Sequence, residues 1–151
     1  MAYWDTSALL KLYIDEPDSS EFWELLRLPR NGVWTSTIAR TEMFCALQRK
    51  QQLGELQAGG AAAVYKRFFK DVEKGRIALI GLTEDVHREA ERVGAVLSDK
   101  KPPLRVRSLD LIHLASALAA KSRELVATDV RLRDVATVAG LLVLPRPWAT
   151  E

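Results

Sequence analysis

Short apolar runs alternate along this chain with longer segments in which apolar residues recur at helical spacing. The short runs are bounded by Gly, Pro, Asp, Ser or Thr, as strands usually are. We predict strands at residues 2–5, 33–36, 76–80, 125–128 and 141–144. We predict helices at residues 7–14, 20–28, 38–53, 61–74, 84–97, 109–120 and 131–139. This alternation is typical of an α/β fold, so we expect a short parallel sheet of about four to five strands flanked by helices.

Length and composition fit one ordinary globular domain. The chain has 151 residues, of which 48% are hydrophobic and 28% are charged, and single domains commonly have about 100 to 150 residues. We therefore expect a single domain over residues 1–151. The formal net charge of +2 is too small to indicate wrapping of nucleic acid, so any site for a polyanion must be local.

Cysteine usage and apolar stretches favour a cytoplasmic protein with no membrane span. The single cysteine, Cys45, excludes an intramolecular disulfide and a cysteine-rich zinc site. Asp5 interrupts what would be the apolar region of a secretion signal. The longest uncharged stretches, 111–120 and 135–145, are about half of the ~20 residues that a membrane-spanning helix requires.

The cysteine and the tryptophans are predicted to pack in the core. They are Cys45, Trp4, Trp23, Trp34 and Trp148.

Acidic residues are normally exposed, because burying an unpaired carboxylate is costly. Four acids nevertheless lie in apolar surroundings: Asp5, Glu42, Asp110 and Asp129. Asp5 and Asp129 stand where a predicted strand gives way to a predicted helix, and the carboxyl ends of parallel strands form the crevice where ligands bind. Glu42 and Asp110 lie near the starts of their predicted helices. All four can therefore converge on one edge of the sheet.

Carboxylates gathered in one pocket repel each other, so they either share protons or hold a cation. A set of oxygen ligands suits Mg²⁺ or Mn²⁺ rather than Zn²⁺. Such an ion polarises a phosphate oxygen and lowers the pKa of a bound water, which prepares hydroxide for in-line attack. The pattern predicts phosphoryl transfer or hydrolysis of a phosphate ester.

Each acid also has a purely structural interpretation. Asp is a favoured helix N-cap, so Asp5 and Asp129 can simply cap the helices that follow them. Asp110 can complement the dipole of its helix. Glu42 can be exposed or form a salt bridge with a neighbouring arginine.

Four segments carry a resemblance to a known family. They read DTSALLKLYIDEP from Asp5, TEMFCAL from Thr41, RSLDLIHLASAL from Arg107 and TDVRL from Thr128. Together they resemble the PIN domain, and their order and spacing are similar to those of VapC-type toxins of bacterial and archaeal toxin-antitoxin pairs. The resemblance covers nearly the whole chain, and its first and third segments are the more specific ones.

The resemblance implies a single PIN-like domain that is a metal-dependent endoribonuclease, cleaving RNA phosphodiesters with Mg²⁺ or Mn²⁺. Asp5, Glu42, Asp110 and Asp129 match the family's acidic positions. They would hold one or two ions, directly or through water.

The resemblance also bears on neighbouring residues and on partners. Thr6 and Ser7 match small hydroxyl residues that can orient a carboxylate or a water. Many relatives have Thr or Ser two residues before the last acid, where this chain has Ala127, with Thr128 adjacent instead. Family members usually form homodimers and are kept inactive by a cognate VapB-type antitoxin, so both are implied here.

A basic segment lies just before the third acid. Its cations are Lys100, Lys101, Arg105 and Arg107. We expect them to contact RNA phosphates beside the metal, with a solvated basic loop as the alternative. His113 falls three residues after Asp110 and so on the same helix face. We interpret His113 as a packed neighbour of the site and not as a metal ligand.

Two other functions fit parts of the pattern. A haloacid-dehalogenase-like phosphatase also begins with an aspartate after a strand, but it needs a second one where this chain has Ser7. The other alternative is a PIN-like module that binds RNA or protein without cleaving. Four mutually repelling carboxylates argue against such a module, which has no need of them.

Overall fold

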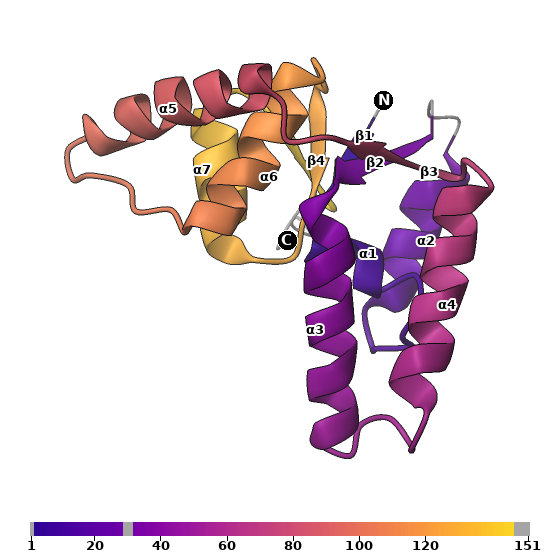
Figure 1. Cartoon of the computed structure of the whole chain (residues 1–151). Coiled ribbons are helices and arrows are strands. Elements are labelled where there is room, and N and C mark those ends of the chain that lie inside the picture. Colours follow the sequence, from indigo (N-terminus) through magenta and orange to yellow (C-terminus); the bar gives the residue numbers. More distant parts are fainter. Residues whose placement is uncertain (1, 29–31, 147–151) are drawn as a thin grey trace.

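A five-stranded parallel sheet lies at the centre of the computed structural model, which describes residues 2–28 and 32–146 (Figure 1). The strands are β1 Ala2–Trp4, β2 Val33–Ser36, β3 Ile77–Ile80, β4 Glu124–Val126 and β5 Leu142–Leu144. Their order across the sheet is β3-β2-β1-β4-β5. The predicted α/β class, the strand number and the parallel arrangement are confirmed.

Helices cover both faces of this sheet. They are α1 Thr6–Leu10, α2 Ser19–Arg27, α3 Ile38–Gln52, α4 Gly60–Glu73, α5 Glu84–Ser98, α6 Ser108–Ala119 and α7 Val130–Val138. Helices α1 to α4 pack in one apolar cluster with Trp4 and Val126, and α5 to α7 pack in another with Tyr3 and Leu125 (Figure 1). Alternate residues of β1 and β4 therefore serve opposite cores, as the two-residue repeat of a strand requires. None of the helices in the described ranges is long and apolar enough to cross a membrane.

Local hydrogen bonds explain where the helices begin and end. The side chains of Asp5, Thr83 and Asp129 accept bonds from backbone N–H groups in the first turns of α1, α5 and α7. Helix α1 ends at Leu10, well before the predicted residue 14. The amides of residues 11–13 bond three residues back in tight turns instead of continuing the α-helical pattern. The chain can therefore turn within a few residues into α2.

Two predictions about the core are wrong. Cys45 is exposed, because it lies on the opposite side of α3 from the buried stripe of Ala39, Met43 and Leu47. Trp23 is 42% exposed, since its neighbour Phe22 takes the inward position on α2. Trp4 is buried as predicted and Trp34 is partly buried, while Trp148 lies outside the described residues.

Candidate active site

The four predicted acids come from separate elements that meet at the carboxyl edge of the sheet. Asp5 directly follows β1, and Asp129 follows the neighbouring β4 after two intervening residues. Glu42 lies in the second turn of α3, which begins shortly after β2. Asp110 is in the first turn of α6, whose far end leads back to the start of β4. The topology thus gathers acids that are distant in the sequence.

Asp5 is a buried carboxylate, with only 5% of the residue exposed. Its Oδ1 accepts a hydrogen bond from the Ala8 amide at 2.8 Å, and the Ser7 hydroxyl lies 2.7 and 2.8 Å from its two oxygens. Burial raises the pKa of Asp5 to about 6, and the negative charge of Glu42 adds to this rise. The charge of His113 and the bonds from Ala8 and Ser7 act in the opposite direction, because they favour the ionised form.

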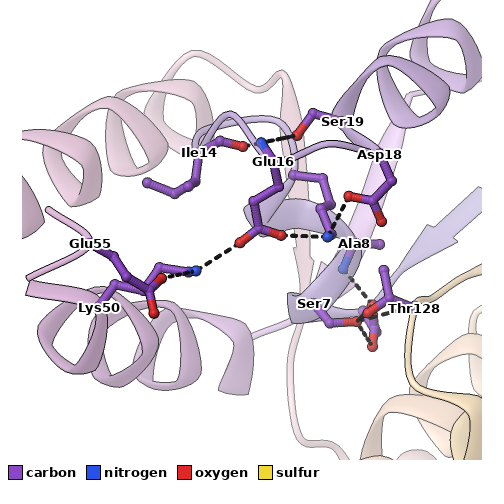
Figure 2. Close-up of polar contacts among 11 residues, drawn as sticks. Ser7, Ala8, Ile14, Glu16, Asp18, Ser19, Lys50, Glu55 and Thr128 are labelled. Atoms are coloured by element: carbon purple, nitrogen blue, oxygen red, sulfur yellow. Dashed lines mark hydrogen bonds and ion pairs between the residues drawn. The ribbon is translucent and has the colours of Figure 1, made fainter. Parts of the chain in front are cut away.

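Ser7 links Asp5 to the loop that carries Asp129. The Thr128 hydroxyl lies 2.7 Å from Ser7 Oγ, so Thr128 donates to Ser7 while Ser7 donates to Asp5 (Figure 2). Thr128 therefore has a direct role in holding two strand ends together, although Ala127 at the preceding position is buried and has no hydroxyl.

Glu42 is held by a histidine and a threonine. Its Oε1 lies 2.7 Å from the Thr6 hydroxyl and 2.6 Å from His113 Nε2. Burial acts to raise the pKa of Glu42, but the hydrogen bonds from His113 and Thr6 outweigh it, so the pKa is lowered. His113 is buried and satisfied, as predicted, but its partner is Glu42 and not Asp110.

Asp110 and Asp129 complete the set of acids. Burial raises the pKa of Asp110, and the charges of Asp129 and Glu42 raise it further. The Arg107 guanidinium acts against this rise. Asp129 caps α7, since its Oδ1 accepts from the Leu132 amide at 3.1 Å. The capping interpretation thus holds for Asp5 and Asp129 alike.

The carboxylate oxygens of these acids are suitable ligands for a hard divalent cation, but their positions do not form a complete coordination site. Their donors are carboxylate oxygens, and the charges of Asp5 and Glu42, of Glu42 and Asp110, and of Asp110 and Asp129 act on one another. Within residues 2–28 and 32–146, however, no three His, Cys, Asp or Glu side chains lie in an arrangement that could hold a metal ion. Protein donors contact three of the four carboxylates: Asp5, Glu42 and Asp129.

The basic segment before α6 is exposed at all four of its predicted cations: Lys100, Lys101, Arg105 and Arg107. Arg107 is the N-cap residue of α6, and its charge reaches Asp110. This places one cation of the segment beside the acids.

A separate cluster of charged residues lies around Glu16, in the segment between α1 and α2 (Figure 2). Lys11 pairs with Glu16 and with Asp18, and Lys50 pairs with Glu16 and Glu55 at 2.7 Å each. Lys11 therefore finds its acidic partners inside this cluster. The cluster joins the segment between α1 and α2 to the last turn of α3.

Sequence reasoning missed the link between Tyr3, His113 and Glu42. The Tyr3 hydroxyl lies 2.7 Å from His113 Nδ1, and it accepts a bond from the Ser36 amide at 3.0 Å. These residues are 33 to 110 positions apart in sequence, so no local spacing could reveal the contacts. The available signal was a tyrosine in a buried strand, whose hydroxyl needs a partner.

Comparisons with known proteins agree with this architecture. The family model of the PIN domain matches residues 2–138. Ribonuclease VapC47 of Mycobacterium tuberculosis (strain CDC 1551 / Oshkosh) is 35% identical over 130 residues, covering 84% of this chain and 81% of that protein. Ribonuclease VapC46 of Mycobacterium tuberculosis (strain ATCC 25618 / H37Rv) is 34% identical over 144 residues, covering 94% of this chain and 95% of that protein.

Solved structures share the fold at low sequence identity. The Mycobacterium tuberculosis VapC20 toxin, described as cleaving the sarcin-ricin loop, has a TM-score of 0.65 at 16% identity and covers 94% of this chain and 97% of its own. A toxin-antitoxin complex from Klebsiella pneumoniae has a TM-score of 0.58 at 18% identity and covers 94% of this chain and 96% of its own. The match over residues 2–138 and the two curated relatives show that this chain belongs to the PIN-domain family, as a VapC-type member.

Proposed function

We propose that this protein is an Mg²⁺- or Mn²⁺-dependent endoribonuclease and the toxin of a toxin-antitoxin pair. One observation carries the proposal: acids from four segments act on one another's charge at the carboxyl edge of the sheet. That arrangement occurs in a chain 34–35% identical to two VapC ribonucleases.

Each residue near the edge has a definite part in this proposal. Asp5, Glu42, Asp110 and Asp129 would hold one or two ions, directly or through water. When bound, such an ion polarises an RNA phosphate oxygen and makes hydroxide available near neutral pH. Thr6 orients Glu42, and Thr128 orients Ser7, which in turn orients Asp5. Metal binding would also relieve the repulsion between carboxylates, which adds to the effect of burial on the pKa values of Asp5 and Asp110.

The exposed cations of the basic segment would bind the substrate. Lys100, Lys101, Arg105 and Arg107 supply the local positive field that the net charge of +2 does not provide. Against the effect of burial, the charge of Arg107 acts to lower the pKa of Asp110, which links this cation of the basic segment to the acids. It would contact a phosphate close to the cleaved bond.

We further propose a cognate VapB-type antitoxin, a homodimer and a cytoplasmic location. The likeness to a toxin-antitoxin complex from Klebsiella pneumoniae supports the first. The single cysteine suits a reducing compartment. Light scattering of the purified chain should give twice the 16.9 kDa chain mass, and a clean monomer would contradict the dimer.

The decisive experiment is RNA cleavage by the purified, antitoxin-free chain. Labelled structured RNA is incubated with Mn²⁺ or Mg²⁺, with chelator, and with the variants Asp129→Asn and Asp134→Asn. Asp134 is the matched control, because it lies exposed on the same helix α7. Cleavage should require the metal and Asp129 and should survive Asp134→Asn. Cleavage that persists in chelator would overturn the carboxylate-metal mechanism, and metal binding without cleavage would favour a binding module.

A further inference from the structure

A chain of buried polar groups runs from the sheet to Glu42. The Ser36 amide donates to the Tyr3 hydroxyl oxygen at 3.0 Å, the Tyr3 hydroxyl lies 2.7 Å from His113 Nδ1, and His113 Nε2 lies 2.6 Å from Glu42 Oε1. Tyr3 and His113 are at most 2% exposed. Such buried groups are costly unless every donor meets an acceptor, so the direction of each bond is constrained.

This constraint applies first to the bond between His113 and Glu42. An ionised carboxylate only accepts hydrogen bonds, so the proton between His113 and Glu42 belongs to Nε2. The Tyr3 hydroxyl accepts the Ser36 N–H and contacts Nδ1 on the other side of the ring. Tyr3 and the sheet thereby hold the ring so that its Nε2–H points at Glu42 Oε1.

The two donors meet one oxygen of Glu42 and spare the other. His113 Nε2 and Thr6 Oγ1 both contact Oε1, at 2.6 and 2.7 Å. Among the described residues, Oε2 takes part in none of the hydrogen bonds that hold this side chain. Glu42 sits on a helix, where without these donors its flexible side chain can turn to solvent.

We infer that His113, locked by Tyr3, is a positioning residue that fixes Glu42 Oε1 and presents Oε2 to the divalent ion of the proposed nuclease. This inference rests on the proposed function, because it assumes that Glu42 is a metal ligand. His113 itself contacts neither RNA nor metal in this role. Residues that orient metal ligands in this way typically contribute about 10- to 100-fold to metal affinity.

The first test needs neither metal nor RNA. In ¹⁵N-histidine-labelled, metal-free protein, NMR of the imidazole nitrogens should show His113 protonated at Nε2, the nitrogen that contacts Glu42. A His87→Gln variant assigns the signals, since the chain has 2 histidines. Tyr3→Phe should shift the Nδ1 resonance, because it removes the hydroxyl that contacts this nitrogen. A proton found on Nδ1 alone would overturn the inference.

The second test measures Mn²⁺ binding by isothermal titration and the Mn²⁺ concentration for half-maximal RNA cleavage. His113→Leu should weaken Mn²⁺ binding about tenfold or more, whereas His113→Gln should largely restore it, because the glutamine amide can donate from the place of Nε2. The control is Leu114→Ala, which truncates a fully buried apolar neighbour of His113 on α6 and so lowers stability without removing a hydrogen bond to Glu42.

The outcomes separate this inference from the proposed function. If the wild type binds Mn²⁺ and cleaves RNA but His113→Leu needs no more Mn²⁺ than Leu114→Ala, the inference is wrong and His113 is only structural. If the wild type cleaves RNA equally well in chelator, the proposed metal mechanism fails, while a proton on Nδ1 alone would separately overturn the contact between His113 and Glu42.

Discussion

At the scale of single residues, Asp5 shows a conflict between stability and the proposed chemistry. Its folded-state pKa of about 6 lies above the ordinary value of 3.8, because burial disfavours the charge. As pH rises from about 4 to about 6, the unfolded chain releases this proton before the folded chain does, so the free energy of unfolding falls. This decrease in the free energy of unfolding is complete above about pH 6 and absent below about pH 4.

Replacing Asp5 should therefore stabilise the protein. We expect Asp5→Asn to raise the free energy of unfolding at pH 7.5 by roughly 1 to 3 kcal/mol, while RNA cleavage is lost. Urea unfolding in chelator at pH 7.5 and at pH 4 measures this, and the gain should shrink at the lower pH. Exposed Asp134→Asn is the control and should change little. A variant less stable than the wild type at pH 7.5 would show that the Asp5 charge is stabilising.

The residues of the site differ in how far the sequence could predict them. Asp5 and Asp129 stand out because an acid interrupts an apolar run at a strand end. The pairing of Glu42 with His113 spans 71 positions, so it depends on how α3 and α6 meet, which no local pattern contains. Cys45 was misplaced for a related reason, since its residue type favours the core but its position on α3 faces outward.

At the scale of elements, periodicity locates the strands and helices, while turn chemistry sets their ends. Strand β2 has the predicted bounds, and β4 begins one residue earlier than predicted and ends two residues earlier. Its predicted end fails because Asp129 caps α7 and the chain leaves the sheet before that cap. Helix α1 is shorter than predicted because turns and the charged cluster around Glu16 hold the segment after it.

Glu16 is the shared partner in that cluster, so it should matter more than an isolated surface acid. It pairs with both Lys11 and Lys50, and these bonds lower its pKa below the ordinary value of 4.5. We expect Glu16→Gln to lower the free energy of unfolding by about 1 to 2 kcal/mol at low salt. Because the pKa is lowered in the folded state, this stability is fully present above the ordinary value of 4.5, and the difference should vanish as pH falls through the lower folded-state value.

Asp85 provides the matched control for this measurement. Its pair with Arg88 is largely exposed, at 78% and 66% of the two side chains, so Asp85→Asn should change stability by less than about 0.5 kcal/mol. Both variants are compared by urea unfolding at two salt concentrations. Equal effects from the two substitutions would mean that the cluster adds nothing beyond ordinary surface pairs.

The basic segment between α5 and α6 makes a further prediction at this scale. If Lys100 and Arg105 bind RNA phosphates, reversing both charges should weaken RNA binding and reduce the slope of log affinity against log salt by about 1 for each phosphate that is no longer neutralised. Lys74→Glu is the control, because Lys74 is exposed just before β3, at the opposite edge of the sheet. An unchanged salt slope would leave the segment as a solvated loop. Catalytically inactive Asp129→Asn protein keeps the RNA intact during these measurements.

At the scale of the whole molecule, two apolar cores share one thin sheet. Trp4 and Val126 belong to the core under α1 to α4, while the adjacent Tyr3 and Leu125 belong to the core under α5 to α7. β1 and β4 have three residues each, so losing one core exposes a face of strands that also support the other. We therefore propose that the chain is a single cooperative unit, in keeping with the single domain expected over residues 1–151.

A core substitution on either face should then destabilise the whole molecule. Phe68→Ala, in the first core, and Leu114→Ala, in the second, should each lower the free energy of unfolding by about 2 to 5 kcal/mol. In both variants, unfolding followed by far-UV circular dichroism and by tryptophan fluorescence should remain one transition with coincident midpoints. Trp4 lies in the same core as Phe68, whereas Leu114 lies in the other core. Leu114→Ala is therefore the variant that best distinguishes one cooperative unit from two separately unfolding cores. If it shifts the helical signal but not the fluorescence transition, the two cores unfold separately, and the sheet does not couple the halves of the proposed site.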